Sequence, residues 1–171
     1  MLTAQEIIER LQLEPLEGEG GYFRETYRSK LTIPSDVLPP FFDGDRRITT
    51  AIFYLLTPET FSAMHRLPGD EVYHFYLGDT VEMLHLHPDG TGEVIRIGND
   101  IVTGMRPQVL VPGGSWQGSR LVSGGSFALM GTTMAPGFES SDYIAGRRAE
   151  LVARYPDYAE LITALTAVTG P

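Results

Sequence analysis

The chain has 171 residues, of which 42% are hydrophobic, and its formal net charge is −9 at pH 7. A chain of this length is expected to form one domain that needs no disulfide or zinc staple. The absence of cysteine excludes thiol chemistry, cysteine zinc sites and iron–sulfur clusters. Lys30 is the only lysine, which leaves little room for Schiff-base or P-loop chemistry. The acidic balance predicts that nucleic acid is not a partner.

Helical patterns occur only toward the two ends of the sequence. The first helix is predicted over about residues 3–13, because Thr3 and Glu6 form a capping-box pattern and apolar residues follow at helical spacing. Two short helices are predicted within about residues 146–167, with a break before Pro156. The first residues do not resemble a signal peptide, and no apolar run approaches the roughly 20 residues of a membrane span. We therefore expect a cytoplasmic protein without membrane association.

The sequence between the helices consists of short apolar runs bounded by Gly, Pro, Asp and Asn. Such runs at regular spacing, without helices between them, predict an antiparallel β-sandwich or barrel, an all-β fold over about residues 18–140. The predicted strands are Tyr22–Arg28, Thr49–Leu56, Thr60–Met64, Val72–Leu77, Val81–His87, Glu93–Ile97, Val109–Val111, Ser115–Leu121 and Phe127–Gly131. The Pro-rich segment Ile33–Arg47 is predicted to be irregular, either a loop over one mouth of the barrel or a plain connecting arm.

The segment most informative about chemistry runs from His65 to Gly78. His65 ends one predicted strand, a Pro-Gly turn follows, and Glu71 opens the next. Antiparallel pairing across a hairpin would place His65 and Glu71 side by side. The two side chains could ligate a metal or act as an acid/base pair. For Glu71 the alternative is an exposed strand edge, and for His65 it is a structural histidine.

This segment resembles the first motif of the cupin superfamily, in which His-x-His is followed by Glu, six further residues and then Gly. His65, Glu71 and Gly78 fit that motif, but Leu67 stands where the second histidine is expected. The second cupin motif resembles Pro112–Gln117, with Gln117 at the position of the histidine. Two of the four usual metal ligands are therefore replaced, by a leucine and by an amide.

Several further blocks resemble a group of small single-domain cupins known as cupin family five, a domain of unknown function. The blocks are Gly20–Tyr27, Phe61–Arg66, Asp70–Gly78, Arg106–Val109 and Ala135–Phe138. The resemblance implies a double-stranded β-helix, the jelly-roll barrel also called RmlC-like. It further implies a polar pocket and a homodimer, and the short N- and C-terminal helices predicted above would flank the barrel.

Several residues are candidates for substrate binding. Gln117 could orient a substrate hydroxyl or carbonyl, or it could bond to the backbone. Strict alternation turns His74 away from Glu71, and only a β-bulge would bring both into one cavity. Arg24 and Thr26 alternate with Phe23, Glu25 and Tyr27, and the sequence does not say which set faces inward. The last group of candidates is aromatic, and each could be pocket wall or plain core: Tyr73, Phe75, Trp116 and Phe138.

Three tempting motifs are set aside. His85 and His87 share one strand face but lack a glutamate at cupin spacing, so we interpret them as a solvated strand end and not as the metal site. The glycines around Glu19 do not form a phosphate loop, because an acid replaces the donors that phosphate needs. The residues around Ser115 lack the closing glycine of a nucleophile elbow.

The sequence thus predicts a small-molecule-binding cupin. It could be an isomerase- or epimerase-like enzyme that acts on a sugar or another polyhydroxy or carbonyl compound. His65 and Glu71 would be its catalytic residues, and no tightly bound metal is expected. One alternative is a metal-dependent cupin, dioxygenase- or lyase-like, in which His65, Glu71 and His74 hold a weakly bound divalent ion. The other is a module that binds a small ligand without catalysis.

Overall fold

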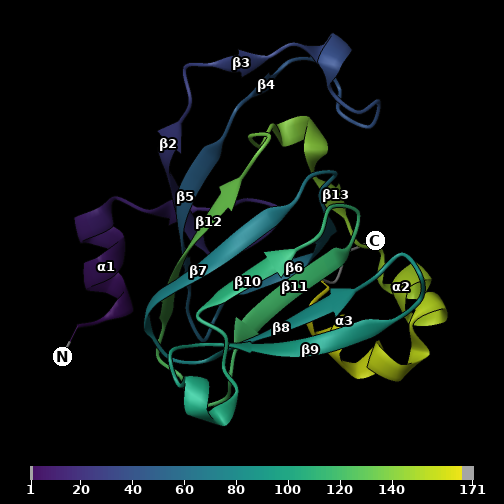
Figure 1. Cartoon of the computed structure of the whole chain (residues 1–171). Coiled ribbons are helices and arrows are strands. Elements are labelled where there is room, and N and C mark those ends of the chain that lie inside the picture. The colour runs from purple at the N-terminus through teal and green to yellow at the C-terminus, as the bar shows by residue number, and fades with distance from the viewer. Residues whose placement is uncertain (1, 167–171) are drawn as a thin grey trace.

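The computed structural model describes residues 2–166. Helix α1 (Ala4–Leu11) begins with the predicted capping box, since the Thr3 hydroxyl accepts from the Glu6 amide and the Glu6 carboxylate accepts from the Thr3 amide. It ends at Gln12, which takes a left-handed conformation. The buried side chain of Ile7 packs against Leu55 and Leu129, so α1 lies on the outer face of the sheet that those residues belong to (Figure 1).

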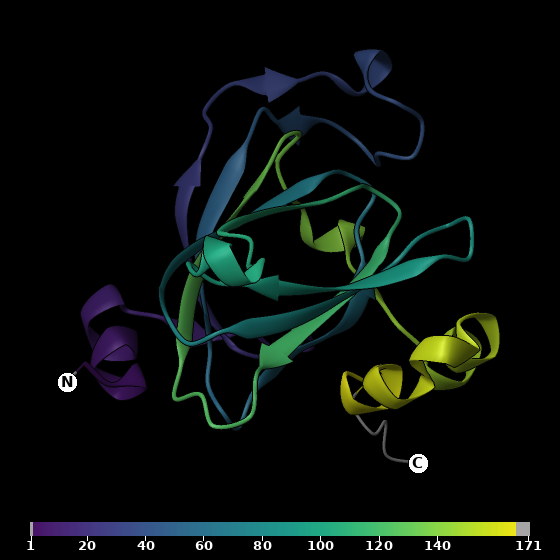
Figure 2. The ribbon, with the colours of Figure 1, turned by 60° about the horizontal axis from the view of Figure 1, so that its bottom comes forward.

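Two antiparallel sheets form the body of the described chain (Figure 1). The larger contains, in spatial order, β1 (Glu14–Pro15), β2 (Tyr22–Arg28), β5 (Thr50–Leu56), β12 (Ala128–Met134), β7 (Glu71–Gly78) and β10 (Gln108–Val111). The smaller contains β13 (Ile144–Ala145), β6 (Phe61–Arg66), β11 (Trp116–Leu121), β8 (Val81–Leu86) and β9 (Gly92–Ile97). Figure 2 shows the strands of the two sheets enclosing a common interior. The predicted jelly-roll barrel is confirmed.

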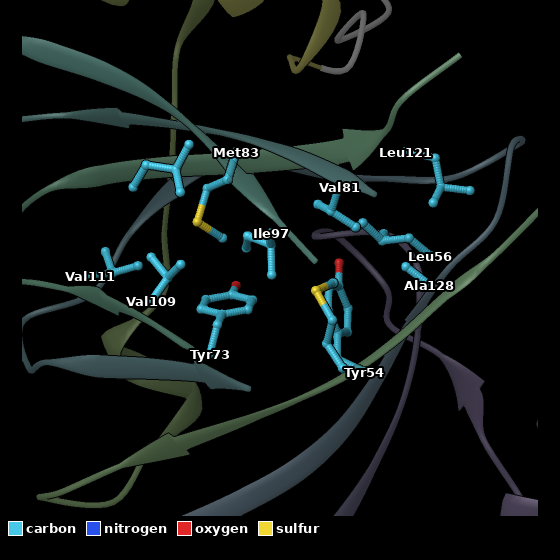
Figure 3. Packing of buried hydrophobic residues seen from close by; sticks show 12 residues of the cluster. Tyr54, Leu56, Tyr73, Val81, Met83, Ile97, Val109, Val111, Leu121 and Ala128 are labelled. Atoms are coloured by element: carbon cyan, nitrogen blue, oxygen red, sulfur yellow. The ribbon is translucent and has the colours of Figure 1, made fainter. Parts of the chain in front are cut away.

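Alternation along the strands sends one set of side chains into the barrel. On β8, Val81 and Met83 face the interior, where they pack with Tyr54 of β5 and Tyr73 of β7. Figure 3 shows Met83 and Ile97 beside Tyr73, and Val81 beside Tyr54. This apolar cluster fills part of the barrel interior.

The C-terminal helices cover the outer face of the smaller sheet (Figure 2). Helices α2 (Arg148–Arg154) and α3 (Ala159–Ala164) are separated by a 3-10 turn, η4 (Pro156–Tyr158), at the predicted break. Leu151 and Ile162 pack against Leu84 and Leu86 of β8, the residues that alternate with the interior ones. The last predicted helical position, residue 167, lies outside the described residues.

The Pro-rich segment forms an arm beyond the larger sheet, at the top of Figure 1. It contains the short pair β3 (Thr32–Ile33) and β4 (Arg46–Arg47) and a 3-10 turn, η1 (Ser35–Val37). The sequence missed these two strands and β1 and β13, because two-residue strands carry no alternation pattern. Two further 3-10 turns are η2 (Ile101–Thr103) and η3 (Ser140–Asp142). In residues 2–166, no helix has the length and apolarity needed to cross a bilayer.

Candidate functional site

A cavity of about 300 Å³ opens between the two sheets. Its apolar walls come mainly from the larger sheet and the segments beside it, and include Leu16, Phe23, Ile52, Tyr54, Tyr73, Met134 and Phe138. Its polar groups come from both sheets and from two loops, and include Glu19, Glu25, Arg28, His65, Glu71, Thr132 and Glu139. The cavity therefore combines an aromatic wall with several carboxyl groups and few cationic ones.

Glu71 is the buried carboxyl group of this cavity. It begins β7 and faces inward with Tyr73, and only 7% of the residue is exposed. The Gln117 side-chain amide donates to Glu71 Oε2 across the barrel at 2.7 Å. Burial raises the pKa of Glu71 above its ordinary value of 4.5, and the nearby Glu19 raises it further, whereas His65, Gln117 and Thr132 lower it. A buried carboxyl group with a raised pKa is better suited than an exposed one to exchange a proton with a ligand.

His65 is buried on the opposite side of the cavity, with one ring nitrogen directed at a backbone carbonyl. Its Nδ1 lies 2.7 Å from the Ala63 carbonyl oxygen. Because a carbonyl can only accept, Nδ1 carries a proton and Nε2 is the ring nitrogen left to contact a ligand. Nε2 is 4.0 Å from a carboxylate oxygen of Glu19, and the ring stacks on Tyr143 with a centroid separation of 5.1 Å. The ring is thus held in one orientation.

His65 and Glu71 do not pair across a hairpin, and the predicted side-by-side arrangement is wrong. β6 pairs with β11 and β13 in the smaller sheet, whereas β7 pairs with β12 and β10 in the larger one. His65 is instead the strand neighbour of Gln117. The turn after β6 crosses from one sheet to the other, so His65 and Glu71 approach the cavity from opposite sides of the barrel.

The turn between β6 and β7 is bonded to the turn that precedes β11. The Leu67 carbonyl accepts from the Gly114 amide at 2.8 Å, and the Asp70 carboxylate accepts from the Gly113 amide at 2.8 Å. His65 and Glu71 flank the first turn, and Gln117 follows the second. These two bonds therefore fix the relative positions of the strand ends that carry the three side chains.

Glu19 is a site residue that the sequence reasoning missed. It lies in the glycine-rich loop that was set aside as a phosphate loop, and one of its carboxylate oxygens accepts from the Ser62 hydroxyl at 2.9 Å. The next residue, Gly20, has φ +100°, and a Cβ there would lie 2.3 Å from the Phe61 carbonyl oxygen. The loop can therefore press against β6 only with glycine at this position. The sequence signal that could have identified Glu19 is its position between glycines in this loop.

A second polar group lies around Arg28 on the cavity wall. The Arg28 guanidinium binds the Glu25 carboxylate through Nε and Nη2 at 2.8–3.1 Å. Its Nη1 binds Glu139 at 2.8 Å, and Nη2 also donates to the Phe138 carbonyl. The register of β2 against β5 shifts between Glu25 and Tyr27, next to this group. The sequence reasoning named Glu25 only as a strand residue and did not consider Arg28 or Glu139.

Of the predicted substrate-binding residues, Tyr73 and Phe138 line the cavity. Gln117 lies behind Glu71 rather than in the wall, and within residues 2–166 its Oε1 has no hydrogen-bond partner. The structure places Arg24 and Thr26 outside the cavity wall, so their predicted place in the pocket is wrong. Arg24 donates to the Leu11 carbonyl at the end of α1, and the Thr26 hydroxyl donates to the Ala51 carbonyl.

His74 also lies away from the cavity, on the opposite face of β7 from Glu71. Its ring nitrogens are 3.3 Å from the Gln108 amide and 3.3 Å from the Thr133 hydroxyl. The β-bulge that would have turned it inward does not occur between Glu71 and His74, where β7 stays in register with β12. Trp116 likewise faces outward toward the C-terminal helices, and Phe75 packs against the core.

The interpretation of His85 as part of a solvated strand end is wrong. His85 follows Val81 and Met83 on the inward face of β8 and is 1% exposed. Its Nε2 lies 2.9 Å from the Met83 sulfur. Burial lowers the pKa of His85 to about 4; Glu93 opposes this shift, whereas His87 and Arg106 add to it, so the ring is neutral at pH 7. His87 is half-buried, 3.9 Å from Glu93.

Comparison with known proteins identifies the family. Residues 5–145 match the family model described as Cupin superfamily (DUF985). The chain belongs to the cupin superfamily. It is also 30% identical over 135 residues to the uncharacterized protein YML079W of Saccharomyces cerevisiae. That match covers 73% of this cupin and 66% of the yeast protein.

Solved structures resemble this cupin over nearly its whole length. Protein SO0799 of Shewanella oneidensis is 31% identical with a TM-score of 0.84, and the match covers 98% of this chain and 99% of that one. A hypothetical protein from Leishmania major is 28% identical with a TM-score of 0.86, over 96% and 99% of the two chains. Bacillus subtilis oxalate decarboxylase shares the fold. It is 15% identical with a TM-score of 0.52, and the match covers 91% of this chain and 38% of that one.

The residues of this cupin do not fit the usual metal set of the superfamily. Oxalate decarboxylase is described as having Mn(II) centres. In this cupin the four ligand positions of the two cupin motifs hold His65, Leu67, Glu71 and Gln117. Leu67 offers no donor, and Glu71 Oε2 is bonded to the Gln117 amide, a poor ligand for borderline metals. Within the described part of the chain no three His, Asp or Glu side chains are placed to hold one ion. His74, the third ligand of the metal alternative, lies on the wrong face of β7.

Proposed function

We propose that this cupin binds a small polyhydroxy or carbonyl compound, such as a sugar, and moves a proton of that compound with Glu71. The observation that carries the proposal is the buried Glu71 carboxyl group, which lines the cavity, has a raised pKa and is fixed by Gln117. A cavity of about 300 Å³ lies at the lower end of the usual range for small-molecule sites. This size suits a compound no larger than a monosaccharide.

Isomerisation or epimerisation begins when a base removes a proton from the carbon beside a carbonyl group. A raised pKa makes the Glu71 carboxylate a stronger base and lets the resulting acid return the proton to a neighbouring carbon. The negative charge that develops on the carbonyl oxygen needs a hydrogen-bond donor. Burial raises the pKa of Tyr73 well above its ordinary value, so its hydroxyl stays protonated and able to donate. Tyr73 shares the cavity-facing side of β7 with Glu71.

His65 supports the same chemistry from the opposite sheet. With Nδ1 bonded to the Ala63 carbonyl, Nε2 is the nitrogen available to a ligand. A neutral ring accepts a substrate hydroxyl there, and a protonated ring donates to the developing oxyanion with Glu19 nearby as counter-ion. The substrate would lie between the two sheets, with Glu71 on one side and His65 on the other.

The proposal is tested by hydrogen exchange, which detects removal of the proton whatever product forms. A panel of aldoses and ketoses is first screened for a rise in melting temperature, and the compounds that bind are incubated with the protein in D₂O. We expect the wild type to incorporate deuterium beside the carbonyl group. Glu71→Gln should slow this exchange by about 10²–10⁴-fold while the dissociation constant changes little. Proton NMR measures the first quantity and calorimetry the second.

The matched control is Glu150→Gln, because Glu150 is an exposed glutamate on α2. It should exchange at the wild-type rate. Binding without deuterium incorporation would contradict catalysis and leave a ligand-binding module. Protein treated with chelator should retain the exchange activity, and activity that returned only with added Mn²⁺ or Fe²⁺ would support the metal-dependent alternative instead.

A further inference from the structure

We infer that Glu25 and Glu139 exclude anionic ligands from the cavity, so that this cupin takes an uncharged or cationic compound and not a phosphorylated, nucleotide-linked or acidic sugar. The inference rests on the proposed function for the existence of a ligand and adds its charge class. The cavity wall contains one arginine, Arg28, and arginine is the side chain best suited to bind phosphate or carboxylate. Whether that arginine is free decides the class of ligand.

Each nitrogen of the Arg28 guanidinium already donates to a partner within the chain. Glu25 takes its Nε and Nη2 in the bidentate geometry that an anionic ligand would need, with contacts of 2.8–3.1 Å. Glu139 takes Nη1 at 2.8 Å, and the Phe138 carbonyl accepts from Nη2. The three side chains line the cavity and are one-third to two-fifths exposed, so a ligand in the cavity can contact the cluster. An incoming anion would have to displace two carboxylates to reach the arginine.

The remaining charges on the wall act in the same direction. Glu19 and Glu71 are acidic, and His65 is the other basic side chain among the lining residues. With Glu25 and Glu139 the wall carries four carboxyl groups against one guanidinium and one imidazole. A phosphate group would meet like charges in a partly enclosed space where solvent screening is weak. The hydroxyl or ammonium groups of a ligand, in contrast, can donate hydrogen bonds to these carboxyl groups.

The aromatic wall fits the same class of ligand. Phe23, Tyr54, Tyr73 and Phe138 line the cavity together with the carboxyl groups. Aromatic faces accept the C–H side of a sugar ring and attract a cation, whereas they offer an anion nothing. An uncharged or amino sugar therefore matches both kinds of wall residue, and a sugar phosphate matches neither.

The direct test uses inorganic phosphate as the probe of anion affinity. Isothermal titration should show no saturable phosphate binding to the wild type. In Glu25→Gln/Glu139→Gln, which frees Arg28, phosphate should bind at least tenfold more tightly than to the wild type. Adding Arg28→Met to that variant should abolish the gain. Phosphate binding by the wild type within threefold of the double variant would overturn the inference, and so would the absence of any gain.

A matched control changes the net charge equally and frees arginines elsewhere. Glu93→Gln/Glu150→Gln removes the carboxyl partners of Arg106 and Arg147 on the surface. It should gain no phosphate affinity, and an equal gain would overturn the inference by showing that net charge alone is responsible. If the double variant in the cavity proves unstable, Glu139→Gln alone keeps one carboxylate on Arg28 and should give a smaller gain in the same direction.

A second arm varies the charge of one sugar skeleton. Glucose, glucosamine and glucose 6-phosphate are compared by thermal shift on the wild-type protein. We expect glucose or glucosamine, and not glucose 6-phosphate, to raise the melting temperature. A larger rise with glucose 6-phosphate would overturn the inference. Failure of Glu71→Gln to slow deuterium exchange would refute the proposed function and leave the charge class standing. Phosphate binding by the wild type would do the reverse, so the two failures are distinguishable.

Discussion

Gln117 holds the carboxyl group of Glu71 from behind the cavity wall. The bond between them is 2.7 Å long and buried, and it joins the two sheets. Leucine has a similar size but no donor, so Gln117→Leu should leave Glu71 under-bonded, raise its pKa further and lower the free energy of unfolding by about 1–3 kcal/mol at pH 7. Urea unfolding measures the change.

A double-mutant cycle separates this bond from packing. In the Glu71→Gln background the carboxylate is absent, so adding Gln117→Leu should cost less than it does in the wild type. Equal costs in both backgrounds would mean that Gln117 contributes by filling space alone. Deuterium exchange by Gln117→Leu, measured on the same samples, reports whether the orientation of Glu71 matters for proton transfer.

Residue type and spacing located part of the site. His65 and Glu71 were identified because a histidine, a turn and a glutamate follow in motif order, and both line the cavity. Glu19 and Arg28 were missed because a loop glutamate and a strand arginine carry no motif of their own. Their positions depend on contacts with Ser62 and Glu139, which lie 43 and 111 residues away in the chain.

At the scale of elements, the arm is fastened beside the cavity by a buried ion pair. Arg46 of β4 binds Asp142 of η3 at 2.8 Å, and the side chains are 2% and 4% exposed. The Arg46 guanidinium also donates to the Asp43 carbonyl, and Asp142 accepts from the Glu139 amide at 3.1 Å. The pair thereby fixes the segment that brings Phe138 and Glu139 to the cavity.

Removal of one partner should be costly, because the other charge stays buried without compensation. Arg46→Met should lower the free energy of unfolding by about 3–5 kcal/mol, and Arg46→Met/Asp142→Leu should cost less than the single change. Urea unfolding checks both values. A single substitution that cost under about 1 kcal/mol, the range of exposed pairs, would contradict the structural role of this pair.

The elements were largely predictable, and their assignment to sheets was not. Short apolar runs bounded by Gly, Pro, Asp and Asn identified the nine longer strands, because strands and the turns between them leave a local record in the sequence. Whether β6 pairs with β7 or with β11 leaves no such record, because a short turn is compatible with a hairpin and with a crossing between sheets. The long-range register between His65 and Gln117 decided it.

For the whole molecule, two buried groups make stability depend on pH in opposite directions. His85 has its pKa lowered to about 4 from 6.5, so between these values the unfolded chain binds more protons and stability rises with pH. Glu71 has its pKa raised above 4.5, so from pH 4.5 upward to its folded-state pKa the folded chain binds more protons and stability falls with pH. The two contributions partly cancel in the wild type.

Single variants should separate them. His85→Leu should lose less stability than the wild type between pH 7 and pH 4, with a difference of up to about 3 kcal/mol. Glu71→Gln should gain stability at pH 7 relative to pH 4.5 when compared with the wild type. Urea unfolding at each pH gives the slopes, which do not depend on the constant cost of either substitution. A wild-type slope in His85→Leu would contradict the assignment.

The two bonded turns, Leu67–Asp70 and Pro112–Gly114, have a consequence for how this cupin could be altered. They set the backbone positions of residues 65, 71 and 117 through two hydrogen bonds, from Gly113 to the Asp70 carboxylate and from Gly114 to the Leu67 carbonyl. The side chains of His65, Glu71 and Gln117 take no part in these two bonds. The three side chains can therefore be exchanged without dismantling the frame that carries them. New chemistry could be designed into this barrel by substitution alone, with the loop lengths left as they are.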